Sequence, residues 1–340
     1  MVGERQINDF LTLKLRGFYV NHDDEVSSYT DKTYQKLGGK WFDISQYDDY
    51  SAGTQVHAHL KLDSHNLFKV GFNYVFDQNK QREYNTRARG KLIRPGWGPD
   101  EVNEAETYTF ALEHEFHWRP FSITWGLSYD RFNPIKSAAT QPTTDIKTLN
   151  PQIGILYQMR EDTSVHLSFG QKTRFPHMRE LYSRRDGNPE LDPQRIYTLE
   201  VGSNHEFEWQ KIKGHLSAAY FYNHIRDLIE RVDISPTERL YINVGRARIQ
   251  GVELDFDIQP FTPLWFGMNY TYLWTKDDER VRPLEERPEH KLNFDVRYRF
   301  PFGLNFSFQT SYTHRQYQYI YDKKTKTEFT RICPDYILLN

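Results

Sequence analysis

Cationic and aromatic side chains are interleaved in two polar stretches of the chain. One is "RFPHMRELYSRRDGNPELDP", residues 174–193, which contains Arg174, His177, Arg179, Arg184 and Arg185. The other lies earlier and contains Arg82, Tyr84, Arg87, Arg89, Lys91, Arg94 and Trp97. Guanidinium groups bind planar anions through paired hydrogen bonds, and cations are attracted to aromatic rings. The two stretches therefore predict binding of an anionic, conjugated ligand. The competing interpretation is that these charges solvate loops or bind lipopolysaccharide phosphates.

Metal and catalytic chemistry have weaker support. His57 and His59 are two residues apart in an alternating stretch, so a strand would place both on one face, with Lys61 following them. This pair lacks a convincing third ligand, and no metal site is predicted. The chain also has no glycine-rich phosphate loop, nucleophile elbow, zinc-protease helix or Cys-His pair. We therefore expect a protein that is not an enzyme.

Composition narrows the class of protein. The 340 residues include 44 Lys plus Arg against 46 Asp plus Glu, so no global charge favours nucleic acid as a partner. No run of about 18 apolar residues occurs, which excludes a membrane-spanning helix. The single cysteine, Cys333, excludes an internal disulfide framework. No apolar signal core follows Met1, so either the protein is not exported or its true start is missing.

Apolar side chains alternate with polar ones along much of the chain, which predicts strands. Between residues 107 and 118 the even positions are mostly aromatic or apolar, whereas the odd positions include Glu113, Glu115 and His117. Residues 252–258 and 292–300 show the same division. We count about fourteen such segments, many close to the roughly 9 to 11 residues that a tilted strand needs to cross a bilayer. No convincing helix is found.

The connections between these segments alternate in length. Tight breaks are expected at residues 63–66, 119–120, 160–162, 259–263 and 300–303, and long polar excursions at 77–104, 130–148, 173–196, 226–248, 275–287 and 314–327. An up-and-down barrel in an outer membrane alternates in this way, with short turns on the periplasmic side and longer loops outside. An arginine or lysine facing lipid near the midplane would cost roughly 2 to 4 kcal/mol, so the strand cations are expected to face the lumen. These are Lys14, Arg16, Lys61, Arg297 and Arg299. The alternative is a large soluble all-β protein whose sheet has one face exposed to water.

Three motifs resemble the barrel signature of TonB-dependent outer-membrane receptors. The first is formed by Arg174, Pro176, Glu180, Leu181, Tyr182, Gly187, Asn188, Pro189, Leu191 and Pro193. The second, "NVGRARIQGVELDF", contains Asn243, Gly251 and Glu253, and the third is "RPEH", with Arg287, Pro288 and His290. The first departs from the family at Phe175, where a small residue is usual, and at Gln194, where Glu is usual.

The resemblance implies a fold larger than this chain. The family's barrel has about 22 strands around a plug domain, so residues 1–340 are expected to be its middle and late portion, an antiparallel up-and-down transmembrane β-barrel domain without plug or last strands. An open sheet edge cannot sit in hydrocarbon, which supports the view that further strands complete the barrel. Glu113, Glu115 and His117 are then expected to hydrogen-bond the plug or channel water.

The resemblance also implies a function in the outer membrane. Such a receptor, embedded in outer-membrane lipid, takes up a scarce ligand with energy transmitted by the TonB complex of the inner membrane. We expect a ferric siderophore as the ligand because of the cationic loops, and cobalamin (a corrinoid) next because the late strand motifs also resemble that branch of the family. Haem is third, because His177 lies near where haem-importing relatives carry an axial histidine. No resident cofactor is expected, and the transported ligand would be a metal chelate. The rival from another class is a passive diffusion porin.

Overall fold

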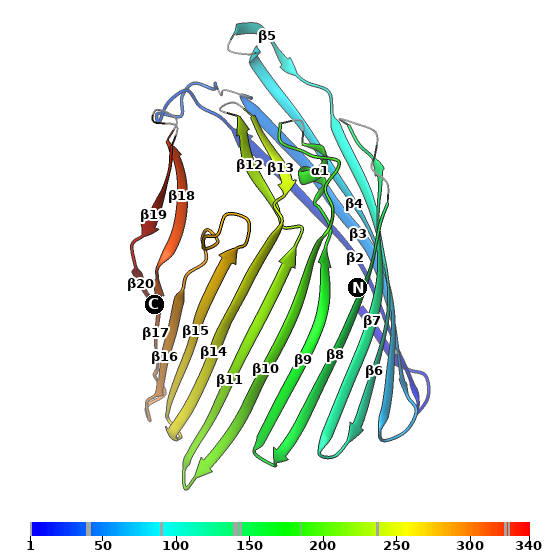
Figure 1. Cartoon of the computed structure of the whole chain (residues 1–340), viewed down its shortest axis with the longest axis vertical. Helices are drawn as coiled ribbons and strands as arrows, with labels where there is room; N and C mark the ends of the chain where they lie inside the picture. Colours follow the sequence, from blue (N-terminus) through cyan, green and yellow to red (C-terminus); the bar gives the residue numbers. More distant parts are fainter. Residues whose placement is uncertain are drawn as a thin grey trace.

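The computed structural model describes residues 2–38, 42–88, 91–138, 142, 145–183, 185–235, 238–322, 325 and 327–340. Nearly all of this is antiparallel strand (Figure 1). The strands are β1 (Val2–Gln6), β2 (Leu11–Ser27), β3 (Ile44–Lys61), β4 (Asn66–Ala88), β5 (Lys91–Trp97), β6 (Glu101–Trp118), β7 (Phe121–Lys136), β8 (Ile146–Arg160), β9 (Thr163–Arg174), β10 (Gln194–Trp209), β11 (Ile212–Arg226), β12 (Ile229–Ser235), β13 (Glu238–Asn243), β14 (Arg246–Phe261), β15 (Leu264–Asp277), β16 (His290–Arg299), β17 (Asn305–His314), β18 (Gln316–Asp322), β19 (Thr327–Cys333) and β20 (Tyr336–Leu339).

Sixteen of these strands form one continuous antiparallel sheet, in which most strands pair with the next one along the chain. The order runs β1-β2-β3-β4-β6-β7-β8-β9-β10-β11-β14-β15-β16-β17-β20, with β5 added to β4 and with β12–β13 and β18–β19 as separate hairpins. Figure 1 shows tilted strands side by side in a curved wall. The wall is open, with β1 and β20 as its edges in the part of the chain that the structure describes. The all-β, up-and-down fold predicted from sequence is confirmed.

Short and long connections lie at opposite ends of the wall. The short ones, at residues 7–10, 62–65, 119–120, 161–162, 210–211, 262–263 and 300–304, are at the lower end in Figure 1. Two of them, at 7–10 and 210–211, were not among the expected breaks. At the turn after β3, Asp63 Oδ1 accepts hydrogen bonds from the backbone N–H groups of His65 (2.7 Å) and Asn66 (2.8 Å), which closes the turn locally.

Two expectations about the long connections were wrong. Residues 77–104 are largely strand, since β4 continues to Ala88 and β6 begins at Glu101. Beyond the lipid both faces of a strand meet water, so backbone pairing continues without the apolar alternation that identifies it. The loop after β9 contains a helix, α1 (Met178–Tyr182). Its five residues are too few for a 3.6-residue period to be recognised. No helix among the described residues is long and apolar enough to cross a membrane.

The strand residues divide cleanly between two faces. Leu15, Val56 and Val70 share one face by register and are 56%, 39% and 44% exposed although apolar. The predicted inward cations Lys14, Arg16, Lys61, Arg297 and Arg299 occupy the opposite parity. Trp118 and Trp209 are exposed at short-turn ends and Trp274 is exposed near a long-loop end, as expected for interfacial aromatics.

A small hydrophobic core lies on the inner face at the long-loop end. Leu181 and Tyr182 of α1 are buried against Ala105 of β6 and Phe132 of β7. Leu191 and Ile229 complete the cluster, and Phe175 stacks on Phe132 with ring centroids 5.3 Å apart. Fully burying a leucine-sized side chain contributes about 1.5–3 kcal/mol, so this cluster anchors the loop to the wall.

Candidate functional site

The segment between β9 and β10 is folded into a platform, defined here as residues 174–194, rather than a loose loop. Arg174, at the end of β9, donates from Nη1 to Glu180 Oε2 (2.9 Å) and from Nη2 to Glu180 Oε1 (3.1 Å). Its Nε donates to Gln194, which is buried at the start of β10. Glu180 Oε2 also accepts a hydrogen bond from the backbone N–H of His177 (2.8 Å). The arginine therefore ties both ends of the segment to its helix.

The glycine of the first motif closes a tight turn. Gly187 N–H donates to the Ser183 carbonyl (2.9 Å), and a Cβ on Gly187 would lie 2.5 Å from Ser183 N. Only glycine allows the chain to approach itself this closely. The next residue, Asn188, donates from its backbone N–H to the Glu180 carbonyl (2.8 Å), so the turn is held against α1.

The first two motifs meet beside the platform, where Asp192 and Asn243 are 51 positions apart in sequence. Asn188 Nδ2 donates to the Tyr241 carbonyl of β13 (2.9 Å). Asp192 N–H donates to Asn243 Oδ1 (2.9 Å), and Asn243 Nδ2 donates back to the Asp192 carbonyl (3.0 Å). The buried Asp186 accepts from Arg231 of β12 (3.2 Å). The hairpin β12–β13 is thereby fastened to the platform.

The predicted ligand-binding cations of the platform have different surroundings. The Arg174 guanidinium is hydrogen-bonded to the Glu180 carboxylate. Arg185 Nη2 lies 2.7 Å from Glu83 Oε1 of β4, and its guanidinium lies 5.1 Å from the Phe42 ring centroid. His177 and Arg179 are exposed, and neither side chain makes an ion pair with a described residue. Arg184 lies outside the described residues.

The earlier cationic stretch lies partly on the other face. Arg82 Nε donates to Gln46 Oε1 (2.8 Å), and its guanidinium lies 4.6 Å from the Trp97 ring centroid. Tyr84 and Trp97 are cross-strand partners with ring centroids 5.4 Å apart. By register Arg82 and Tyr84 have the parity of the outward-facing Val70, so the structure places them away from the lumen. The side chains of Arg87, Arg89, Lys91 and Arg94 lie outside the described residues.

The remaining motif residues lie in the wall of the sheet. A Cβ on Gly251 would lie 2.3 Å from the Tyr272 carbonyl, so the β14–β15 approach requires glycine there. Glu253 follows two residues later on the inner face. His290 begins β16, and its Nδ1 lies 2.7 Å from the Tyr270 hydroxyl. Ahead of it, Arg287 donates to the backbone carbonyl of Glu286 (3.4 Å), and Pro288 completes the motif.

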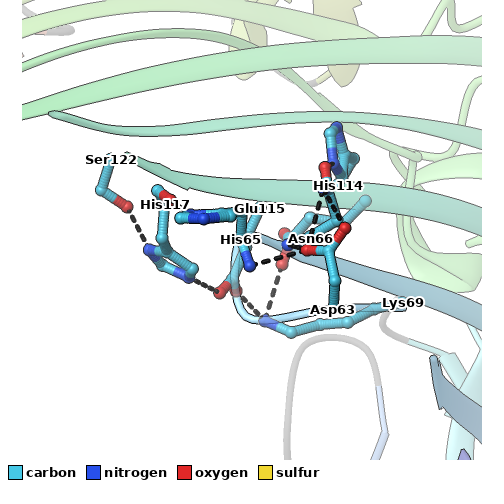
Figure 2. Close-up of polar contacts among 9 residues, drawn as sticks. Asp63, His65, Asn66, Lys69, His114, Glu115, His117 and Ser122 are labelled. Atoms are coloured by element: carbon cyan, nitrogen blue, oxygen red, sulfur yellow. Dashed lines mark hydrogen bonds and ion pairs between the residues drawn. The ribbon is translucent and has the colours of Figure 1, made fainter. Parts of the chain in front are cut away.

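The lumenal row of Glu113, Glu115 and His117 forms a network within the wall (Figure 2). Lys69 of β4 bonds Glu113 Oε1 (2.9 Å) and Glu115 Oε1, which face it from β6. His117 Nε2 lies 3.3 Å from Glu115 Oε2, and its Nδ1 lies 2.8 Å from Ser122 Oγ of β7. Lys69 could not be recognised as part of this row from the sequence, because only the strand register brings it opposite the two glutamates.

The predicted His57 and His59 do share the inner face, where His57 Nε2 lies 3.2 Å from Asn73 Oδ1. Among the described residues, no three His, Cys, Asp or Glu side chains are grouped so that they could hold a metal ion. The arrangement at the long-loop end is thus a folded polar platform held to the wall by hydrogen bonds and ion pairs.

Comparisons with known proteins agree with this architecture. The family model described as "TonB dependent receptor-like, beta-barrel" matches residues 3–340. An uncharacterized TonB-dependent receptor of Haemophilus influenzae is 26% identical over 201 residues, covering 54% of this chain and 55% of that protein. The heme/hemopexin utilization protein C of Haemophilus influenzae is 24% identical over 295 residues, covering 76% and 40%.

Solved structures show the same fold. The copper transporter OprC superposes with a TM-score of 0.77 at 14% identity, covering 98% of this chain and 54% of that one. The siderophore receptor PiuA from Acinetobacter baumannii superposes with a TM-score of 0.71 at 17% identity, covering 99% and 56%. This chain thus spans about half the length of the proteins it resembles, 40% to 56% across these four.

Proposed function

The chain belongs to the TonB-dependent receptor-like β-barrel family, whose members are outer-membrane receptors and transporters rather than enzymes, and from this premise we propose that it forms the wall of a receptor for energised ligand uptake. The observation that carries the proposal is the platform clamped to the inner face at the long-loop end. A folded polar surface at that position can hold a ligand at the mouth, whereas a diffusion pore needs only an open bore.

We propose a ferric siderophore as the ligand. His177 and Arg179 are exposed polar groups of the platform that pair with no described carboxylate. Arg185, Glu190 and Asp192 are exposed as well, and Arg185 is already paired with Glu83. Cations held on a rigid surface suit an anionic chelate because little conformational entropy is lost on binding. Arg82, Tyr84 and Trp97 face outward, so they are not part of this proposed ligand site.

Uptake measurements test the energised mechanism. Cells carrying the gene for this protein are given an iron-55 siderophore panel, cobalamin and haem, with and without collapse of the proton gradient. We expect uptake of a siderophore that stops when the gradient is lost, because the TonB complex draws on it. Uptake that continues without the gradient would indicate a porin. Gradient-dependent uptake of cobalamin alone would show that the ligand is cobalamin and not a siderophore.

A pair of variants tests the ligand site. Arg179→Gln is expected to weaken siderophore binding about tenfold, which corresponds to the loss of one charge-assisted hydrogen bond. Arg82→Gln is the matched control, since it removes an arginine from the same end of the wall but from the outward face. Equal loss in both variants, or in neither, would contradict the assignment to the platform.

Haem is a second candidate because His177 exposes an imidazole on the platform. A relative named heme/hemopexin utilization protein C adds support. If haem is the ligand, His177→Ala should abolish haem binding and remove the absorption shift that an axial histidine causes. Unchanged haem affinity in this variant would show that His177 is not the axial ligand of the haem iron.

A further inference from the structure

Basic residues are concentrated on the outward face at the long-loop ends of four strands. Arg195 of β10 pairs with Arg226 of β11, and Arg226 pairs in turn with Arg246 of β14. Arg248 of β14 pairs with Lys276 of β15. We call these five residues the cationic rim. Like charges directly opposite each other in a sheet destabilise it, so such a row favours binding of anions.

The register shows that the rim continues the lipid-facing surface. On β10, Arg195 has the parity of Leu199 and Val201, which are exposed although apolar. On β11, Arg226 has the parity of the exposed Leu216 and Tyr220. The cations therefore continue the outward face beyond its apolar residues, at the long-loop ends of the strands.

Only one carboxylate neutralises the rim within the described residues. Asp278 accepts from Arg248 Nε at 3.0 Å with both carboxylate oxygens. Arg195, Arg226, Arg246 and Lys276 have no carboxylate oxygen within 4.0 Å in the described part of the chain. The hydrogen bonds from Arg248 hold the pKa of Asp278 below its usual value, and the charges of Lys276 and Arg246 lower it further.

Two internal comparisons show that the rim is unusual for this wall. On the same face, Arg131 of β7 and Lys147 of β8 are also cross-strand partners, but both pair with Asp145, at 2.7 Å and 3.3 Å. At the short-turn ends of β10 and β11 the outward positions hold Phe207, Trp209 and Ile212 instead of cations. On β10 and β11 the unneutralised charge is therefore confined to the long-loop end.

We propose that the cationic rim binds the phosphate groups of a phosphorylated lipid in the outer leaflet. Neighbouring strands are about 4.8 Å apart, so the four strands spread the cations over roughly 14 Å, enough for a headgroup with two phosphates. Arginine forks match phosphate oxygens, and the acyl chains of the same lipid would lie along the apolar band below. Continuity with that band favours a lipid over a free anion.

Binding to the purified full chain in phosphate-free detergent tests the proposal, with bisphosphorylated lipid A, dephosphorylated lipid A and inorganic pyrophosphate as probes. The test variant combines Arg195→Gln, Arg226→Gln, Arg246→Gln and Lys276→Gln, and it keeps Arg248 so that Asp278 retains its partner. We expect this variant to bind bisphosphorylated lipid A at least tenfold more weakly, with a smaller dependence on salt. Arg131→Gln with Lys147→Gln is the matched control and should bind normally.

Three results would overturn the proposal. They are equal affinity in the rim variant and the unmodified chain, equal binding of dephosphorylated lipid A, and displacement of the lipid by pyrophosphate at matched concentration, which would assign the rim to free phosphates. If the fourfold variant does not assemble, Arg195→Gln with Lys276→Gln removes half of its charge change and is expected to give a smaller loss. Normal affinity in that assembled double variant would then reject the rim.

Discussion

Arg185 and Glu83 are 102 residues apart in sequence, yet the arginine Nη2 lies 2.7 Å from the glutamate Oε1. This ion pair joins the platform to the extended part of β4, across the long-loop end of the wall. Glu83 has the inward parity of β4, whereas its neighbours Arg82 and Tyr84 face outward. The pair therefore links an inward side chain of this polar strand to the platform.

Charge reversal tests this contact. Glu83→Lys places two cations together and should accelerate proteolysis of the platform, whereas Glu83→Lys combined with Arg185→Glu should restore much of the resistance. The coupling should be at most about 1 kcal/mol, because both side chains are partly exposed. Limited proteolysis of the three variants measures it. Independent, additive effects would show that the two residues do not interact.

The clamp on α1 should depend on the arginine fork. Arg174→Ala leaves Glu180 largely buried without its bidentate partner, so local opening of residues 178–182 should become easier by about 2 kcal/mol. Hydrogen exchange of the α1 amides measures the change. Arg179→Ala, on the exposed side of the same helix, is the control and should alter exchange little. Equal effects would contradict a special role for Arg174.

Gly187→Ala should disturb the platform because the added Cβ would lie 2.5 Å from the Ser183 nitrogen and 2.6 Å from its carbonyl oxygen. Backbone cannot give way as a flexible side chain does, so a loss of about 1–3 kcal/mol is expected. Platform exchange protection and the fraction of assembled protein measure it. Gly154→Ala is the control, since no atom lies within 4 Å of its added Cβ.

Lys69 should stabilise the short-turn end of β4 and β6. Lys69→Met leaves Glu113 and Glu115 on the same face without their cation, which should lower local stability by about 1 kcal/mol after allowance for partial exposure. Hydrogen exchange of residues 66–69 at neutral pH reports it. Lys61→Met, on the same face, is the comparison and should have a smaller effect.

The turn after β3 should respond to acid in a defined direction. Hydrogen bonds from the Asn66 side chain and the His65 N–H hold the pKa of Asp63 below the ordinary 3.8. Because the folded pKa is depressed, this stabilisation is present above pH 3.8 and is lost as pH falls through the folded value. Asn66→Ala should move the pKa back toward 3.8, which titration of Asp63 by NMR detects. An unchanged titration would show that Asn66 does not cause the shift.

The period-two pattern was enough to predict the strands and their faces within the lipid band, and the alternation of short and long connections. It did not predict the strand residues beyond that band, such as the extension of β4 to Ala88 and the hairpin β12–β13. A position that faces lipid must be apolar whatever its neighbours are. The residue type of Val56 and Val70 is therefore enough to predict that they face outward. The motif residues likewise identified the family, because Gly187 and Arg174 satisfy local backbone and charge requirements that few other residues meet.

Strand register and loop packing could not be predicted in this way, because they depend on residues far apart in sequence. Lys69 was missed beside its glutamates, the cationic row of Arg195, Arg226 and Arg246 was not seen, and Arg82 was grouped with Arg185 although they lie on opposite faces. The alternation of apolar and polar residues predicts which face of its own strand a side chain lies on. Only the tertiary structure decides which residue of the next strand stands opposite, and hence which charges meet.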